Sequence, residues 1–358
     1  MRDFGAKHSR DWIRVSNSLW IDLLEHLSIG GHMKEAERAL ETWDISVQCI
    51  RADAVPEVYH VEATTGERFV LKNVGAPDVL VRTETQFRVT RHVHDSGLPI
   101  AYLVETRSGL SYSRIDSSIY ILMPFLPDDE PDFYGPDSGP LYRTIGAAYG
   151  RLHAILADFE GPIETWEDNA YDPLFKDYVP EALPKLSGEA RRRVEDTLSE
   201  VEGHLRLIAS SLPMEPVFQD VHRGNVRMVK GEFRGFIDCD HISIGQRIDD
   251  ITTALISLIK YRGRNGLPSK DKTDEHRRWW LAHFSEFLAS YNAVNPLRPL
   301  EKDHLLYVML ARCLPELEEI KGGTASLELL DWFYAHRTEI EIGIMSIGGQ
   351  NAVFGSGS

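Results

Sequence analysis

The segment from 217 to 250 of this 358-residue chain contains three oxygen-bearing side chains whose types and order could serve chemistry. Asp220 is followed five residues later by Asn225 and, thirteen residues after that, by Asp238. Phosphoryl transfer uses such a set, because a first carboxylate orients the attacking hydroxyl and takes its proton, while an amide and a second carboxylate hold Mg²⁺ against the phosphates. We therefore predict that Asp220 is the catalytic residue and that Asn225 and Asp238 are the metal ligands.

The residues between Asn225 and Asp238 predict a short β-hairpin. Two apolar runs, 226–229 and 233–237, flank a turn at Lys230-Gly231. Such a hairpin would return Asp238 to the mouth of the loop that carries Asp220. A competing interpretation is that these are ordinary turn residues, since Asp and Asn satisfy backbone groups locally. Their combination in this order favours a shared site.

This stretch resembles the aminoglycoside phosphotransferase family, small-molecule kinases with a protein-kinase-like fold. The family's loop reads H-G-D-x-H-x-x-N, followed by I-D and by G-x-R-x-x-D. The matching residues are Asp220, His222, Asn225, Ile237, Asp238, Gly245, Arg247 and Asp250. The resemblance implies an α+β fold with two lobes, an antiparallel sheet with a helix in the N-terminal lobe and mainly α-helices in the C-terminal lobe. It also implies that Asp250 bonds backbone N–H groups of the catalytic loop.

Two departures from the family pattern are visible. Phe218 and Gln219 stand where the family has His and Gly, a difference that concerns the geometry of the loop more than its chemistry. Cys239-Asp240 stands where protein kinases have Phe-Gly, which argues against the protein-kinase branch.

Lys72 lies in a run, 69–74, whose pattern is typical of a strand. Kinases carry the lysine that pairs with the nucleotide phosphates on such a strand. The helix predicted over 80–94 contains Glu84 as its only internal acidic residue, so Glu84 is the candidate partner of Lys72. Two alternatives stay open: Lys72 as a solvated edge residue, and an exposed pair of Glu84 with Arg88 at i, i+4.

The strand predicted over 119–125 leads into the connection between the lobes. A kinase hinge recognises adenine through one backbone carbonyl and an N–H two residues later. Pro124 can supply the carbonyl and Leu126 the N–H. The loop at 51–56, where a kinase covers the phosphates, contains no glycine, although close backbone approach to phosphate favours it. ATP with Mg²⁺ is the cofactor pair that this arrangement predicts.

The order of elements predicts four parts. These are an N-terminal extension (1–32), an N-terminal nucleotide-binding lobe (33–126), a C-terminal catalytic and substrate lobe (127–347) and a flexible tail (348–358). The boundary between the lobes follows from the Pro-, Gly- and Asp-rich connection at 127–140. Strands are predicted at 45–50, 58–61 and 69–74, after a helix at 33–43. Further helices are predicted at 141–157, 188–210, 249–261, 273–293, 302–320 and 327–345.

The composition, 42% hydrophobic and 26% charged, is that of a soluble globular protein. No apolar run approaches the ~18 residues that a membrane span needs, and the first residues lack the apolar core of a signal peptide. We therefore expect no membrane partner and a cytoplasmic location. Cys49, Cys239 and Cys313 are too few and too scattered for a disulfide framework or a zinc site, which agrees with a reducing compartment.

The net charge of −16 disfavours nucleic acid as a partner, because binding to a phosphate backbone needs clustered Lys and Arg. The part through Phe125 carries 14 basic and 17 acidic residues, a net of −3, and the remainder carries 25 and 38, a net of −13. This asymmetry would draw a cationic substrate towards the C-terminal lobe. A solvated acidic surface is the commoner explanation. The oligomeric state stays open.

Together these features predict an enzyme, a Mg·ATP-dependent phosphotransferase. It would move the γ-phosphate of ATP to a hydroxyl of a small polar molecule, such as an aminoglycoside-like antibiotic, an amino alcohol or a sugar. The alternative is a degenerate kinase-like protein that binds nucleotide and serves in regulation, which Phe218 and the glycine-free loop motivate. A protein kinase acting on peptides would need the Asp-Phe-Gly motif and an activation segment, which are missing.

Overall fold

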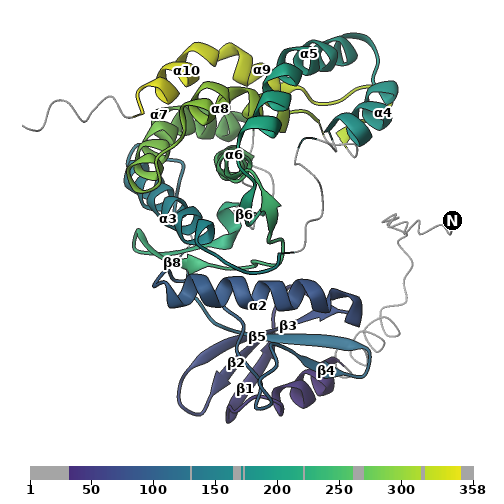
Figure 1. The fold of residues 1–358 in the computed structure, drawn as a ribbon, viewed down its shortest axis with the longest axis vertical. Coiled ribbons are helices and arrows are strands. Elements are labelled where there is room, and N and C mark those ends of the chain that lie inside the picture. Colours follow the sequence, from purple (N-terminus) through teal and green to yellow (C-terminus); the bar gives the residue numbers. More distant parts are fainter. Residues whose placement is uncertain are drawn as a thin grey trace, which may run out of the picture.

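The structure, a computed structural model, has two lobes (Figure 1). It describes residues 32–129, 131–163, 171, 174–220, 222–260, 270–315 and 319–347. A sheet with a long helix forms one lobe, and helices form most of the other, so the predicted two-lobed α+β fold is confirmed. Residues 1–31 and 348–358, which hold nearly all of the predicted extension and the whole predicted tail, lie outside the described ranges. The lobe boundaries stay predictions.

An antiparallel sheet with strand order β1-β2-β3-β5-β4 forms the N-terminal lobe in the described part of the chain. Its strands are β1 (Val47–Ala52), β2 (Val58–Ala63), β3 (Arg68–Gly75), β4 (Ser113–Ile115) and β5 (Ser118–Pro124). β1 begins two residues later than predicted, whereas β2 and β3 begin within one residue of their predicted starts. The three-residue β4 was not predicted, because so short a strand carries no periodic signal of its own.

Alternation of side chains gives the two faces of this sheet different roles. On one face, Tyr59, Leu71 and Tyr120 pack in a buried cluster with a helix over residues 32–40. On the other, Lys72 lies opposite Val58 of β2 and Ile121 of β5. The long helix α2 (Leu80–Asp95) covers this second face and lies between the sheet and the other lobe (Figure 1). The strand pattern therefore directs Lys72 towards the junction of the lobes.

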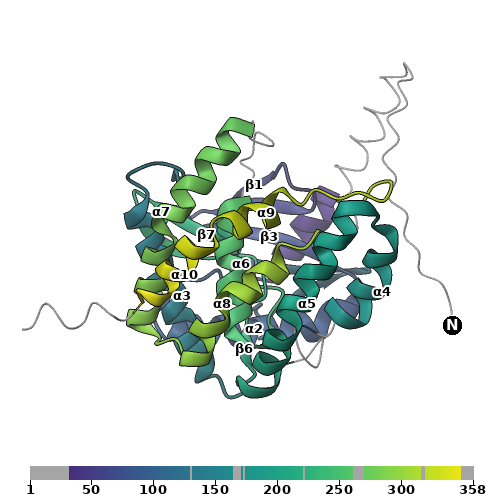
Figure 2. The same ribbon diagram turned by 90° about the horizontal axis from the view of Figure 1, so that it is seen from above.

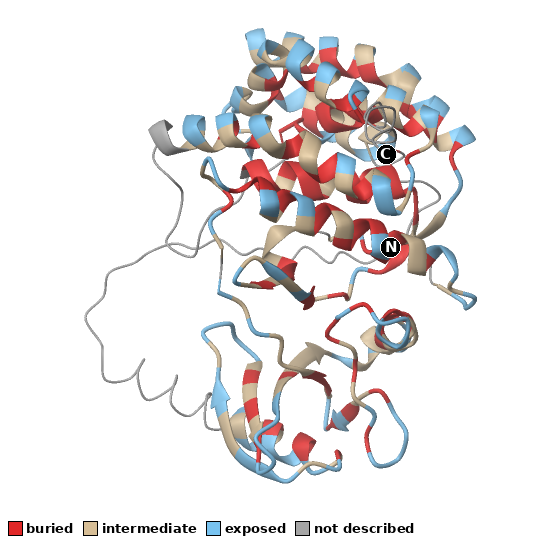
Figure 3. Ribbon diagram, turned by 90° about the vertical axis from the view of Figure 1, so that its left-hand side faces the viewer, coloured by how far each residue is buried: buried red, intermediate tan, exposed pale blue. Residues whose placement is uncertain are grey.

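Helices with one apolar face build the C-terminal lobe, and Figure 3 shows buried residues concentrated where these helices meet. They are α3 (Gly139–Ala157), α4 (Val179–Ala182), α5 (Gly188–Ser211), α6 (Arg247–Lys260), α7 (Lys270–Val294), α8 (Pro299–Arg312), α9 (Glu328–Ala335) and α10 (Arg337–Met345). Viewed from above, the last helices lie over the rest of the molecule (Figure 2). α3 and α7 approach closely, since a Cβ on Gly146 would overlap the backbone of Phe287. No helix in the described residues has the length and apolar character to cross a bilayer.

Two predicted helices end differently in the structure. The helix predicted over 302–320 ends at Arg312, because Leu314 precedes Pro315 and a residue before proline is disfavoured in helical geometry. The helix predicted over 327–345 is interrupted at His336, whose backbone (φ −109°, ψ 19°) leaves the helical region. The sequence has no glycine or proline at that interruption, so α9 and α10 were predicted as one continuous helix.

Two histidines meet where α5 packs on α8. The Nδ1 atoms of His204 and His304 lie 2.7 Å apart, and the His204 ring stacks on Tyr307 at 3.4 Å between centroids. One imidazole must donate and the other accept, so the contact requires at least one unprotonated Nδ1. Burial, and next the charge that His304 would carry, lower the pKa of His204. Of the other groups facing it, Glu200 opposes this shift and Arg337 adds to it.

We expect the pair to destabilise the protein at acidic pH. Because the pKa of His204 is lower in the folded chain than in the unfolded one, protonation favours unfolding as the pH falls below the unfolded value of ~6.5. The Tm of the wild-type protein should therefore fall more between pH 7 and pH 5 than the Tm of His204→Gln. Thermal melts across this range test the difference, and His94→Gln, at the exposed end of α2, serves as the control. Equal losses in wild type and His204→Gln would contradict the expectation.

Candidate active site

Four short strands surround the predicted catalytic loop: β6 (Glu215–Val217), β7 (Val226–Val229), β8 (Glu232–Phe236) and β9 (Ser243–Gly245). β6 ends directly before the loop and pairs antiparallel with β9. Between them, β7 and β8 form the predicted hairpin, with Lys230 and Gly231 both at positive φ in its turn. The hairpin returns the chain so that the Ile237 N–H donates to the Asn225 carbonyl at 2.9 Å. Asp238 is therefore brought back beside Asn225.

Asp250 fixes the backbone of the predicted catalytic loop through hydrogen bonds. Its carboxylate accepts hydrogen bonds from the N–H groups of Phe218 (2.8 Å) and Gln219 (3.0 Å). His153 Nε2 lies 3.2 Å from the same carboxylate, and His153 Nδ1 lies 2.7 Å from the Tyr291 hydroxyl. With the ring proton on Nε2, every one of these groups is satisfied. This is the structural task that the family resemblance implies for Asp250.

Gln219 has a strained backbone. Its φ is 57°, in the left-handed region that glycine prefers, and the Asp220 N–H bonds back to the Phe218 carbonyl at 2.6 Å around it. The family has glycine at this position, and the geometry supplies the physical reason. The two bonds from Asp250 help to hold Gln219 in this conformation, so the departure from the family pattern leaves the tight turn in place.

Replacing Gln219 by glycine should relieve this strain. We expect Gln219→Gly to raise the free energy of unfolding by ~0.5–1 kcal/mol, since the lost left-handed strain exceeds the entropy that glycine adds to the unfolded chain. Gln219→Ala is the matched control, because it removes the side chain but keeps the Cβ that causes the strain. Denaturant unfolding of the three proteins measures the effect. A destabilised Gln219→Gly would show that the side chain, and not the backbone, matters here.

Lys72 reaches across from the N-terminal lobe to the residues that follow the hairpin. Its Nζ lies 2.5 Å from Asp238 Oδ1 and 3.4 Å from Asp240 Oδ2. Burial disfavours the charged ammonium, but the attraction and hydrogen bonds of Asp238 and then Asp240 outweigh it, so the pKa of Lys72 is raised above its ordinary value. Asp240 was missed by the sequence analysis. Asp238 has a φ of 56°, so the segment is not a regular strand, and no strand periodicity in the sequence pointed to Asp240.

The predicted contact between Lys72 and Glu84 is not formed. Glu84 is exposed, because α2 presents Thr83, Gln86 and Thr90, at helical spacing, to its packed side. The alternative pair with Arg88 is not found either, since Arg88 Nη2 donates to the Pro162 carbonyl at 2.9 Å. Among the described residues, the acidic partners of Lys72 come from the other lobe.

Asn225 is oriented by the loop that it belongs to. Its amide Nδ2 donates to the Asp220 carbonyl at 3.0 Å and to Asp220 Oδ2 at 3.2 Å. The carbonyl oxygen Oδ1 is therefore the atom that can turn towards a cation. Together with the carboxylate of Asp238, it would offer a metal ion oxygen ligands of the kind that Mg²⁺ prefers. Cys239, next to Asp238, is buried, and burial raises the pKa of its thiol well above the ordinary value, so we expect it to be inert.

A cavity of about 820 Å³ opens between the lobes and contains most of the predicted site. Its lining includes Lys72, Pro124, Leu126, Asn225 and Asp238. The glycine-free loop also borders it, since Asp53, Ala54 and Val55 belong to the lining. This loop is held by its own polar groups: Asp53 Oδ1 accepts from the Val55 N–H at 3.0 Å, and Asp53 Oδ2 lies 2.6 Å from His60 Nε2. Of the predicted site residues, Glu84 and Asp220 are not part of the lining.

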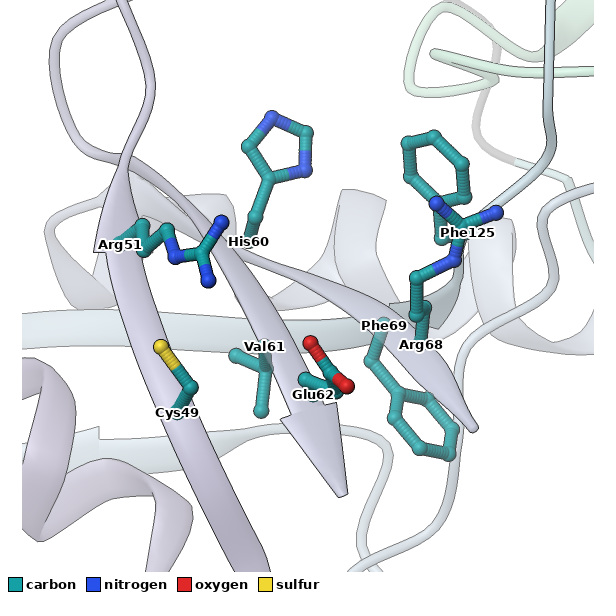
Figure 4. A pocket seen from close by; sticks show the side chains of 8 residues that line it. All are labelled: Cys49, Arg51, His60, Val61, Glu62, Arg68, Phe69 and Phe125. Atoms are coloured by element: carbon teal, nitrogen blue, oxygen red, sulfur yellow. The ribbon is translucent and has the colours of Figure 1, made fainter. Parts of the chain in front are cut away.

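A smaller recess of about 260 Å³ adjoins this cavity on the sheet (Figure 4). His60 and Phe125 border both spaces. The Arg68 guanidinium lies over the Phe125 ring at 4.3 Å, and Arg51 extends from β1 on the same side. The recess therefore lies beside the cavity, past the predicted hinge, and its two arginines share the lining with the carboxylate of Glu62.

Comparison with known proteins finds matches over most of the chain. A sequence model described as the phosphotransferase enzyme family matches residues 46–271, more than half of the chain. Homoserine kinase from Neisseria meningitidis serogroup B is 24% identical over 272 residues, which cover 75% of this chain and 81% of that protein.

Solved structures also resemble this chain. An amicoumacin kinase in complex with AMP-PNP, Ca²⁺ and Ami has a TM-score of 0.56 and 18% identity, covering 88% of this chain and 96% of that one. A microcompartment-associated aminopropanol kinase has a TM-score of 0.56 and 15% identity, covering 88% and 94%. At these identities the likeness concerns the fold.

Proposed function

Because the chain belongs to the phosphotransferase enzyme family, we propose that it transfers the γ-phosphate of ATP to a hydroxyl group of a small polar molecule. One observation carries the proposal: Lys72, which lies far from Asn225 and Asp238 in the sequence, lines the same interlobe cavity as these two residues and the hinge residues Pro124 and Leu126.

Each side chain has a task in this reaction that its contacts support. Asp220 orients the acceptor hydroxyl and takes its proton, and its side chain is 41% exposed, so an acceptor can reach it. Asn225 Oδ1 and the Asp238 carboxylate would hold Mg²⁺, which would supply positive charge to neutralise the phosphates. Lys72 pairs with phosphate oxygens once ATP occupies the cavity.

The hinge provides the adenine contacts. β5 ends at Pro124, and the Phe125 N–H donates a hydrogen bond to the Arg68 carbonyl at 2.9 Å. The Pro124 carbonyl and the Leu126 N–H are the backbone groups that we assign to adenine. Val58, Val70 and Met123 line the same cavity and supply the apolar surface against which a base can stack.

The acceptor that we propose is cationic, either an amino alcohol or an aminoglycoside-like molecule. The net charge of −13 after Phe125 supports it, because an acidic lobe attracts a cationic substrate. Screening by salt should weaken that attraction over a Debye length of ~8 Å at physiological ionic strength. The acceptor KM should therefore rise with added KCl.

A panel of acceptors tests the proposal. Purified protein is incubated with Mg·ATP and, separately, with homoserine, aminopropanol, choline, several aminoglycosides and neutral sugars, and mass spectrometry follows the gain of one phosphate. Phosphorylation of amino alcohols or aminoglycosides supports the proposal. Phosphorylation of neutral sugars alone would contradict the proposal that the acceptor is cationic. Binding of Mg·ATP with no transfer to these compounds or to a metabolite extract would favour the nucleotide-binding regulatory protein instead.

A further inference from the structure

Asp240 lies where the second acidic partner of a phosphate-binding lysine is needed. Lys72 Nζ is placed between two carboxylates, those of Asp238 at 2.5 Å and Asp240 at 3.4 Å. The Asp240 side chain is 25% exposed and the Asp238 side chain 44% exposed. Asp240 is thus the more enclosed of the two.

The single negative charge of Asp238 cannot neutralise both Lys72 and a metal ion. If Asp238 turns its charge to Mg²⁺, Lys72 loses its closest partner while it remains largely enclosed, with 26% of its side chain exposed. An ammonium in such a place needs another opposite charge to keep its position. Glu84, the partner used in the family's kinase-like scheme, is exposed on α2 and would require that helix to turn. Asp240 already lies within reach and requires no such movement.

Asp240 could alternatively be a third metal ligand, but the contacts argue against it. Its Oδ2 faces Lys72, and its Oδ1 lies 3.8 Å from His241 Nε2. The orientation therefore suits a partner for a cation on a side chain.

We propose that Asp240 is a positioning residue, which holds Lys72 towards the nucleotide phosphates after Asp238 has engaged the metal ion and so takes the task that sequence analysis gave to Glu84. This inference rests on the proposed function, because it assumes that Mg·ATP binds in the cavity. It places both partners of Lys72 on one short segment of the C-terminal lobe, so that nucleotide binding and the approach of the two lobes are linked through Lys72.

Calorimetric titration of Mg·ATP tests the inference without knowledge of the acceptor. We expect Asp240→Asn to weaken Mg·ATP binding by roughly 10-fold, as expected for a partly enclosed charge pair, and Asp240→Glu to restore much of the loss. Glu84→Gln, the matched control, should stay within about 2-fold of wild type. In a Lys72→Met background, which itself binds weakly, Asp240→Asn should cause no further loss, because its effect acts through Lys72. Asp240→Ser provides a second charge-free variant if Asp240→Asn does not fold.

Three outcomes would overturn the inference. The first is unchanged Mg·ATP binding in Asp240→Asn. The second is a loss that is fully additive with Lys72→Met. The third is weakened binding of Mn²⁺ alone, followed by paramagnetic resonance, in Asp240→Asn, which would make Asp240 a metal ligand. If the wild-type protein itself fails to bind Mg·ATP, the proposed function fails. If the wild-type protein binds Mg·ATP and Asp240→Asn binds it equally well, only the role proposed for Asp240 is wrong.

Discussion

Asp220→Asn should lower kcat by roughly 10²- to 10⁴-fold and leave Mg·ATP affinity close to that of the wild-type protein. The substitution removes the carboxylate that we propose takes the proton of the acceptor hydroxyl. It keeps an oxygen that can accept the hydrogen bond from Asn225 Nδ2, now at 3.2 Å. The loop and the proposed metal ligands should therefore stay in place.

Two measurements check this result. Turnover on an acceptor found by the panel gives kcat, and calorimetry gives Mg·ATP affinity. Asp196→Asn, on the exposed side of α5, is the matched control for loss of one carboxylate and should behave as wild type. An Asp220→Asn enzyme with near wild-type kcat would mean that the catalytic assignment of the loop is wrong.

Asp238→Asn should have a different signature, because it acts on binding as well as on turnover. Loss of the carboxylate removes charge from the proposed Mg²⁺ site and also removes the partner at 2.5 Å from Lys72. We expect Mg·ATP affinity to fall by at least ~10-fold, and the Mg²⁺ concentration needed for half-maximal activity to rise.

Calorimetry at several Mg²⁺ concentrations separates Asp238 from Asp220. If Asp238→Asn binds Mg·ATP as tightly as wild type and shows the same Mg²⁺ dependence, Asp238 is not a metal ligand. Thermal melts of both variants should accompany the titrations, so that an effect on folding is not taken for an effect on the site.

Much of the architecture could be predicted because its signals are local. The hairpin between Asn225 and Asp238 follows from two apolar runs around a Lys-Gly turn, and Lys72 follows from the strand pattern around it. A tight turn or a strand depends mainly on neighbouring residues, so its pattern is visible in the sequence. The order Asp220, Asn225, Asp238 has the same local origin.

Side-chain partners across the fold could not be predicted in the same way. The sequence contained Glu84 as the only acid inside its helix, but the direction of that residue depends on how the whole helix packs. Asp240 reaches Lys72 only because the two lobes meet, at a separation of 168 residues along the chain. No local sequence pattern indicates that the two lobes approach each other at this point.

By itself, then, the sequence determined the kind of chemistry and the elements that carry it: two carboxylates and an amide at a spacing suited to Mg²⁺ and phosphate, on a loop and a hairpin. Only the tertiary structure decided that the backbone of Gln219 is strained and that Lys72 turns to the carboxylates of the C-terminal lobe. The physical reason is the distance along the chain over which each kind of interaction acts. Turn and strand preferences act over a few residues, whereas the packing of helices and the pairing of buried charges depend on every element that the fold brings together.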